Sequence, residues 1–227
     1  MTAQETRFTL PRNITTLAKF ELSPCGRYMA AAGRFGTLNL FDAKSQELLH
    51  SFKQEENVSG ICFTSNRQLI ASSFGSTINI YSLRTQRLEH SFFDEGCTRG
   101  HAMDLAPNQR LLATGSLEGV VNVYDFESVQ RSETPKPAKT FFNLTTAIAK
   151  VKFNHSSELL SMCSSSVSAG VKIAHFPSGT VYSNFPGSQS DVGQIQTMAF
   201  SPSSGYLALG NRSKEVRLFR LKHFKNY

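Results

Sequence analysis

Leu22-Ser-Pro-Cys-Gly-Arg-Tyr-Met-Ala30 is a stretch whose arrangement returns four more times along this chain of 227 residues. Each copy begins with an apolar anchor, continues with turn-forming residues, and places a second apolar residue seven positions after the anchor, followed by a small residue. The anchors lie 41 to 48 residues apart, and they are Leu22, Phe63, Leu105, Phe153 and Phe200. Strand, tight turn and strand at this period predict a β-propeller blade, with the small residue where neighbouring sheets crowd together.

A third strand is expected after each hairpin, because apolar residues alternate with other residues and an aromatic residue usually closes the run. The five runs are 38–41, 78–81, 121–124, 171–174 and 216–219. The fourth strand is clearest in 45–52 and 85–92, which match each other at an offset of 40 residues. Period-two alternation fits strands half-buried between stacked sheets, so the sequence predicts an all-β chain of five four-stranded antiparallel blades.

We expect a single β-propeller domain over residues 1–227, with blades at about 11–52, 53–92, 93–142, 143–185 and 186–227. Residues 131–139 are expected as an exposed loop between the third and fourth strands of the third blade. Two architectures stay open. Either Arg7–Leu10 adds an outer strand to the last blade and closes the ring, or the chain forms an open arc that depends on further blades or partners.

The composition restricts the classes of function. No apolar run approaches the roughly 18 residues needed to span a membrane, and the N-terminus has no signal-peptide layout, so export is not expected. The four cysteines form no C-x-x-C pair and have no histidine at ligand spacing. We therefore expect reduced thiols in an intracellular compartment, no metal site and no cofactor. The net charge of +7 favours a polyanionic partner such as RNA.

The anchor segments resemble WD40 repeats in a degenerate form. The chain has no tryptophan, so the Trp-Asp signature of the repeat becomes Phe41-Asp42, Tyr81-Ser82, Tyr124-Asp125, Ala174-His175 or Phe219-Arg220. The one Gly-His dipeptide lies too near its anchor to match the usual placement. Because of these departures, we expect the buried His/Asp/Ser/Trp hydrogen-bond network of WD40 blades to be absent, and packing to hold the blades together.

The C-terminal part is similar to the end of the WD-repeat family of U3 small nucleolar RNA-associated protein 18. The similar segments are Gly170–Pro186, Met198–Asn211 and Leu218–Tyr227, and further matches occur in the same order at Phe93–Gly96, Gly119–Tyr124 and Pro135–Leu144. That family has about seven blades, whereas the first recognised blade here starts almost at Met1. The resemblance therefore implies the C-terminal propeller part of such a protein, shortened at the N-terminus, as an incomplete arc of a seven-bladed ring.

The resemblance also implies a function. It is a non-catalytic scaffold role in the small-subunit processome, in U3-dependent pre-18S rRNA processing and ribosome small-subunit biogenesis, in the nucleolus of the nucleus. The implied partners are other processome proteins, including WD-propeller and helical-repeat subunits, together with the U3 small nucleolar ribonucleoprotein and pre-rRNA. No membrane and no small-molecule substrate is implied. The alternative is a generic WD-repeat adaptor in a ubiquitin-ligase or signalling complex, because this fold hosts many functions.

Basic residues crowd the last expected blade and form the candidate contact site for RNA or a partner. They are Arg212, Lys214, Arg217, Arg220, Lys222 and Lys225. Such side chains bind phosphates without sequence preference, or they protect a solvated strand edge against pairing with another strand. Strand alternation predicts that Arg217 lies opposite Val216 and Leu218 and points away from the buried face.

No catalytic residues are expected. Propeller hydrolases need carboxylates gathered at the central channel, whereas the acidic residues here fall mostly in turns. No phosphate-binding glycine loop, G-x-S-x-G elbow or Ser/His/Asp set is present. We expect Asp104, one residue before the anchor Leu105, to form a polar contact in the channel or at a partner site.

Overall fold

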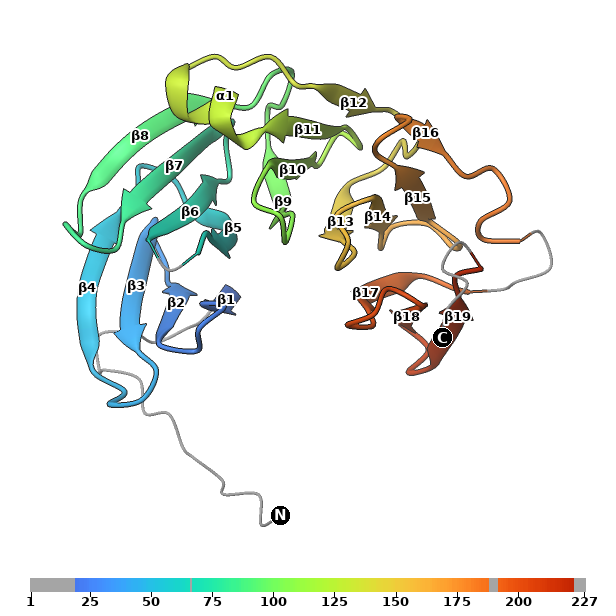
Figure 1. Ribbon diagram of the computed structural model, residues 1–227, viewed down its shortest axis with the longest axis horizontal. Helices are drawn as coiled ribbons and strands as arrows, with labels where there is room; N and C mark the ends of the chain where they lie inside the picture. The colour runs from blue at the N-terminus through green and yellow to red at the C-terminus, as the bar shows by residue number, and fades with distance from the viewer. Residues whose placement is uncertain (1–18, 66, 188–191, 223–227) are drawn as a thin grey trace, which may run out of the picture.

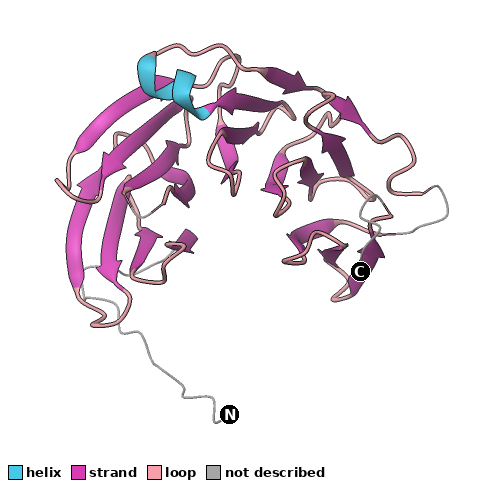
Figure 2. Cartoon of the chain, in the orientation of Figure 1, coloured by secondary structure: helices cyan, strands magenta, loops and turns pink. Residues whose placement is uncertain are grey.

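The computed structural model describes residues 19–65, 67–187 and 192–222. The regular secondary structure of this part is β-strand apart from one short helix, and loops and turns connect the strands (Figure 2). The strands form five sheets that follow each other along the chain and radiate from a common centre (Figure 1). Within each sheet the strands are antiparallel and lie in chain order, with the first strand nearest the centre. The predicted propeller architecture with five sheets is confirmed.

The first sheet contains β1 (Lys19–Leu22), β2 (Tyr28–Ala32), β3 (Thr37–Asp42) and β4 (Leu48–Lys53). The second contains β5 (Val58–Phe63), β6 (Gln68–Ser73), β7 (Thr77–Ser82) and β8 (Leu88–Phe93). The third contains β9 (Gly100–Leu105), β10 (Leu111–Ser116), β11 (Val121–Asp125) and, after α1 (Phe126–Arg131), β12 (Lys139–Phe141). The fourth contains β13 (Ile148–Phe153), β14 (Leu159–Ser164), β15 (Val171–His175) and β16 (Thr180–Val181).

The fifth sheet differs from the expected four strands. Its described strands are β17 (Ile195–Phe200), β18 (Tyr206–Asn211) and β19 (Val216–Arg220). Arg7–Leu10, which was expected as its outer strand, lies outside the described residues. The sheet that ends the described part therefore has β19 as its outermost strand.

The five sheets form an open arc in the described part of the chain. Their innermost strands pack against each other in the order β1, β5, β9, β13 and β17. Figure 1 shows the first and fifth sheets at the two ends of this arc, with β1 and β17 facing each other across an opening. This arrangement corresponds to the open-arc alternative and not to a closed ring of five blades.

The hydrophobic core lies between neighbouring sheets. At the first junction, Leu38 and Leu40 of β3 pack against Ile61, Phe63 and Leu69 of the second sheet, and all five are buried. Burying a side chain of this kind stabilises the fold by about 1.5–3 kcal/mol. Because each inner sheet is covered on both faces, its stability depends on both neighbours.

The anchor hairpins have the predicted pairing in four of the five sheets. Leu22 pairs with Met29 in the first sheet, and the third, fourth and fifth sheets repeat this spacing. In the second sheet Phe63 pairs with Leu69, because the β5–β6 connection is one residue shorter than the others. A one-residue slip moves every side chain to the other face.

This slip corrects the expectation that a small residue occupies the same slot in all five copies. Ala30, Ala113 and Ser161 are fully buried at the expected place, opposite Glu21, Asp104 and Lys152. In the second sheet this position is occupied by Ile70, which pairs with Cys62 and packs with Ile78 and Ile80. Ala71 faces the first sheet instead.

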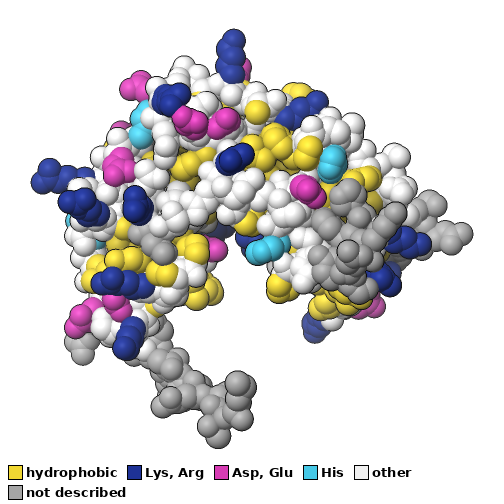
Figure 3. Space-filling view, in the orientation of Figure 1, with side chains coloured by type: hydrophobic (Ala, Val, Ile, Leu, Met, Phe, Trp, Pro, Cys, Tyr) yellow, Lys and Arg dark blue, Asp and Glu magenta, His cyan; other side chains and the backbone are white. Residues whose placement is uncertain are grey.

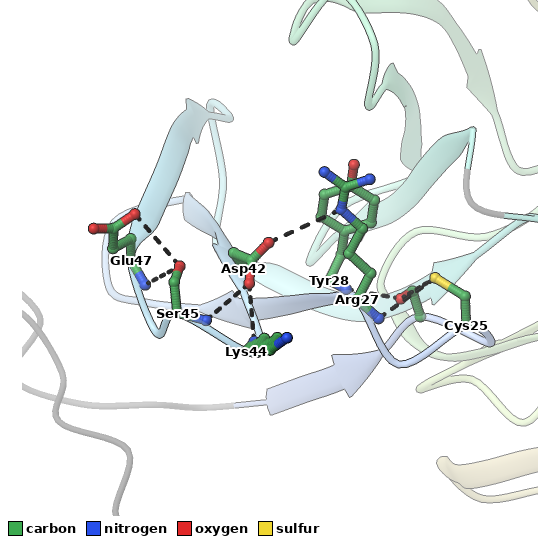
Figure 4. Close-up of polar contacts among 8 residues, drawn as sticks. Cys25, Arg27, Tyr28, Asp42, Lys44, Ser45 and Glu47 are labelled. Atoms are coloured by element: carbon green, nitrogen blue, oxygen red, sulfur yellow. Dashed lines mark hydrogen bonds and ion pairs between the residues drawn. The ribbon is translucent and has the colours of Figure 1, made fainter.

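The aspartate of the degenerate signature holds the turn after the third strand. Asp42 Oδ1 accepts hydrogen bonds from the backbone N–H groups of Lys44 and Ser45, both at 2.9 Å (Figure 4). These bonds hold the pKa of the Asp42 carboxyl below its usual range. Arg27, whose guanidinium lies over the Tyr28 ring, adds a long ion pair of 3.9 Å to Asp42. Such a turn is stabilised by a short polar acceptor, and in the second sheet Ser82 Oγ at the same position accepts the backbone N–H of Thr85.

A buried hydrogen-bond network exists at the junction of the second and third sheets, where none was expected. Asp94 Oδ1 accepts from the Tyr124 hydroxyl at 2.6 Å and from Asn122 Nδ2 at 2.8 Å. Thr140 donates to Asn122 Oδ1, and the backbone N–H of Glu95 donates to the Tyr124 oxygen. The prediction that packing alone holds the blades is wrong here, because other residue types build an equivalent network.

The one described helix, α1, was not predicted. Asp125 forms its N-cap by accepting the backbone N–H of Glu127 at 2.9 Å, and Phe126 and Val129 bury its inner side. The expected loop accordingly starts after Arg131, and its last residue, Lys139, belongs to β12. Among the described residues, no helix has the length and the apolar composition that crossing a membrane requires.

Candidate interaction surfaces

The basic residues predicted as a contact site lie along the last described strand. Arg212 and Lys214 belong to the β18–β19 turn, Arg217 and Arg220 belong to β19, and Lys222 follows it; Lys225 lies outside the described residues. Asn211 Oδ1 fixes the turn by accepting the backbone N–H of Glu215 at 2.9 Å. Because a strand rises about 3.3 Å per residue, the turn and Lys222 are roughly 20 Å apart. The residues therefore form a line along the strand and not one compact cluster.

Arg217 and Arg212 are among the side chains of this set that are engaged within the chain. Arg217 forms an ion pair with Glu215 at 3.3 Å, and Arg212 Nη1 donates to Gln194 Oε1 at 3.4 Å. Lys214 and Lys222 are exposed. Figure 3 shows Lys and Arg side chains spread over the visible face along the whole arc. The fifth sheet thus contributes to a positive surface that extends over the molecule.

The predicted orientation of β19 is wrong. Val216 and Leu218 are 76% and 65% exposed, whereas Arg217 is half-buried on the face that packs against the fourth sheet. In the first and fourth sheets the corresponding residues, such as Leu40 and Ile173, are buried by the sheet that follows. No described sheet follows the fifth, so its apolar face stays uncovered. The sequence correctly predicted that Arg217 points to the opposite face from Val216 and Leu218. It did not show which of the two faces a neighbouring sheet covers.

The other end of the arc has a matching apolar face. Phe20 and Leu22 of β1 are 64% and 52% exposed, although the corresponding Ile61 and Phe63 of β5 are buried against the first sheet. On the same face, Asn39 is buried and its Nδ2 has no hydrogen-bond partner among the described residues. Strand β1 therefore exposes two apolar side chains of the kind that β5 buries, whereas Ala31, Asn39 and Phe41 of β2 and β3 are buried on the same face.

The central channel contains charged residues that connect neighbouring sheets. Asp104 of β9 accepts from Lys152 Nζ at 2.6 Å and from the backbone N–H of Phe153 at 2.8 Å. Burial raises the pKa of the Asp104 carboxyl, and Lys152 opposes this shift. Lys152 and Asp104 line a cavity of about 310 Å³ together with Glu21. Asp104 is thus a polar contact between two innermost strands.

Further contacts of the channel join strands of four sheets. Lys19 Nζ donates to the backbone oxygens of Ser59 and His101, the latter at 2.8 Å. His101 Nδ1 lies 2.8 Å from the Ile148 backbone oxygen, so this nitrogen carries the proton. In the described part of the chain, no group of three or more His, Cys, Asp or Glu side chains is arranged to hold a metal ion. These polar groups serve inter-sheet packing.

A groove at the junction of the first two sheets was missed in the sequence. Phe35 and Phe74, in the β2–β3 and β6–β7 turns, line it together with Glu55 and Glu56. The sequence does contain a signal, because Phe35-Gly36 and Phe74-Gly75 place an aromatic residue before glycine at the same turn of two consecutive repeats. Without knowledge of the loops beside them, that signal does not indicate a groove.

Comparison with known proteins places the chain in a family. The WD40 repeat family (WD domain, G-beta repeat) matches residues 46–82, which run from β4 into β7. The U3 small nucleolar RNA-associated protein 18 homolog of Drosophila melanogaster is 50% identical over 226 residues, covering 99% of this chain and 45% of the relative. The chain belongs to the WD-repeat family of U3 small nucleolar RNA-associated protein 18.

The similarity to this family extends over distant organisms. The human U3 small nucleolar RNA-associated protein 18 homolog is 34% identical over 92% of this chain and 38% of its own length. U3 small nucleolar RNA-associated protein 18 of Saccharomyces cerevisiae is 41% identical over 51% of this chain and 19% of its own length. The chain thus spans less than half the length of the curated U3 small nucleolar RNA-associated protein 18 relatives it matches.

Proposed function

We propose that the chain is a non-catalytic scaffold subunit of the small-subunit processome, acting in U3-dependent pre-18S rRNA processing and ribosome small-subunit biogenesis. The observation that carries this proposal is the 50% identity over 99% of the chain to a protein named for its association with U3 small nucleolar RNA. The place of action is the nucleolus, where pre-rRNA is processed. Its partners are the U3 ribonucleoprotein, pre-rRNA, and other WD-propeller and helical-repeat subunits.

The geometry supports a scaffold role. Both ends of the arc expose apolar side chains that inner sheets bury, namely Phe20 and Leu22 at one end and Val216 and Leu218 at the other. Exposed apolar patches of this kind mark surfaces for protein association. The channel carboxylate of Asp104 is held by Lys152 and by a backbone N–H, which favours a structural role for it over a catalytic one.

Affinity purification of the tagged chain from its own cells, with sequencing of the bound RNA and identification of the bound proteins, tests the proposal. We expect enrichment of U3 RNA, pre-rRNA and other processome propellers over a tag-only control. A V216E/L218E variant, which changes only exposed side chains, tests whether the C-terminal end face contributes, and we expect it to lose protein partners while staying folded. Recovery of a ubiquitin ligase or a kinase, with neither U3 RNA nor nucleolar proteins, contradicts the proposal and favours the adaptor.

A further inference from the structure

The groove between the first and second sheets is open on the side where the β4–β5 connection meets two hairpin turns. It has a volume of about 500 Å³, and Phe35 and Phe74 stand at it with 77% and 44% of their surface exposed. Glu55 and Glu56 of the connection are exposed in the same groove. The site thus combines two exposed aromatic rings with two carboxylates.

The floor of the groove is fixed by backbone hydrogen bonds. Gln54 N–H donates to the Gly36 oxygen at 2.8 Å, and Phe74 N–H donates to the Asn57 oxygen at 2.7 Å. Asn57 Oδ1 also accepts the Gly36 N–H at 3.2 Å. The connection is therefore attached to both turns, and the backbone segments that carry the two carboxylates and the two rings are fixed relative to each other.

The basic side chains that line the groove have interaction partners within the chain, whereas the acidic side chains form no ion pair with any described residue. Lys53 and Arg99 line the groove, but Lys53 donates to the Phe35 backbone oxygen and Arg99 pairs with Glu118 at 3.4 Å. In the described residues, Glu55 and Glu56 form no ion pair. Arg99 is neutralised by Glu118, whereas Lys53 keeps its charge because a backbone carbonyl does not neutralise it. Together with the carboxylates of Glu55 and Glu56, the groove keeps a net negative charge and has room for one added positive charge.

A neighbouring cavity of about 470 Å³ continues the groove, because Lys53, Glu55 and Glu56 line both. Gln54 lines this second cavity; it is 4% exposed, and its Oε1 has no hydrogen-bond partner in the part of the chain that the structure describes. Leu88 and Phe93, each about half exposed, complete the apolar lining. A buried acceptor without a donor is costly, and a ligand that donates to it removes that cost.

The next junction along the arc provides an internal comparison. Asp94 occupies the place of Gln54, since its N–H donates to Ser76 as that of Gln54 donates to Gly36, both at 2.8 Å. The Asp94 carboxylate is satisfied by Tyr124 and Asn122. Glu118 of the adjoining turn is likewise paired, with Arg99 and Thr98. At the first junction Tyr81 and Asn79 occupy the corresponding positions beside Gln54, whose Oε1 nevertheless has no partner among the described residues.

We propose that the groove of Phe35, Phe74, Glu55 and Glu56 binds an extended basic segment of a partner protein, with an arginine or lysine side chain between the two carboxylates and apolar side chains against the two rings. Arginine suits the site because its guanidinium stacks on aromatic faces and donates to carboxylates at the same time. RNA does not suit it, because the unpaired carboxylates repel phosphates, although the chain as a whole carries +7. The proposal is independent of the role in U3-dependent processing.

Selection of a displayed library of random 12-residue peptides on the folded chain tests the proposal. We expect enrichment of peptides with Arg or Lys flanked by apolar residues. A synthetic copy of the most enriched peptide should bind about tenfold more weakly to E55Q/E56Q and to F35S/F74S, as measured by fluorescence anisotropy. The control E127Q/E133Q removes two negative charges outside the groove, in and just after α1, and should bind as the original chain does.

The outcomes that would overturn the proposal are distinct from loss of folding. Circular dichroism melting of each variant should match the original chain, because the four substituted side chains are exposed. Enrichment of no basic–apolar motif, or an affinity that E55Q/E56Q leaves unchanged, contradicts the proposal. A single-stranded oligouridine probe that competes with the selected peptide also contradicts it, since it identifies the groove as an RNA site.

Discussion

Tyr124 and Tyr81 occupy the same position of consecutive repeats and have different surroundings. Burial raises the pKa of the Tyr124 phenol, and so does the Asp94 carboxylate, which accepts the hydroxyl hydrogen bond at 2.6 Å. The Glu95 N–H donates to the Tyr124 oxygen at 2.8 Å and opposes this shift. Burial is the first cause of the raised Tyr81 pKa as well, but the residue before its sheet is Gln54 and not a carboxylate. One side chain, Asp94 or Gln54, thus decides whether a junction has a charged hydrogen-bond network.

We predict that Tyr124→Phe lowers the free energy of unfolding by about 1–3 kcal/mol, because it leaves the buried Asp94 carboxylate without its shortest hydrogen bond. Tyr81→Phe is the matched control and should cost less, since no carboxylate loses a partner. Urea unfolding followed by circular dichroism measures both. Equal losses for the two variants would show that the network contributes no more than the packing of the rings.

We also predict that Cys25 reacts with iodoacetamide before the other three cysteines. Cys25 is exposed, and hydrogen bonds from Ser23 and from the Arg27 N–H lower the pKa of its thiol. Burial raises the pKa of Cys97 to about 12 and that of Cys163 to about 11, and it raises that of Cys62 as well. At pH 8, mass spectrometry should show one fast alkylation, which Cys25→Ser removes. A fast phase that survives this substitution would contradict the assignment.

The strands could be predicted from the sequence to a large extent, because their signal is local. The anchor Leu22 and its partner Met29 lie on one face of a hairpin, and four of the five sequence copies form this pairing. The helix α1 was missed, since its six residues follow a strand without a long amphipathic pattern. The uncovered face of β19 and the groove of Phe35 and Phe74 depend on which sheets lie beside them, and no local pattern contains that information.

At this level we predict that Leu218→Ala changes the free energy of unfolding by less than about 0.5 kcal/mol, because Leu218 is 65% exposed. Leu40→Ala, at the corresponding position of β3, should cost about 2–5 kcal/mol, because Leu40 is fully buried. Urea titration of both variants provides the comparison. If Leu218→Ala were as costly as Leu40→Ala, the C-terminal face would be covered in solution, by ring closure or by a second copy.

The molecule as a whole carries a positive net charge and exposes apolar side chains at both ends of the arc. Its net charge of +7 is spread along the arc, while Phe20 and Leu22 at one end and Leu218 at the other remain in contact with solvent. In the described arc, only the junctions between neighbouring sheets contribute inter-sheet packing. A partner that binds an end of the arc in the folded state therefore increases the free energy of unfolding. In the proposed scaffold role, binding of partners at the ends of the arc would therefore also stabilise the fold.

The positive surface leads to a prediction about RNA. If Arg212, Lys214 and Lys222 contact phosphates, the triple charge reversal R212E/K214E/K222E should weaken binding of single-stranded RNA. It should also reduce the slope of log K against log salt by about 2, since each phosphate contact on a single strand contributes roughly 0.7. The control K44E/R84E/R87E reverses three exposed charges in turns of the first two sheets and should leave the slope nearly unchanged. Filter binding at several salt concentrations measures both. Equal losses in the two variants would mean that RNA responds to the field of the whole arc, and the fifth sheet would then have no special role in binding it.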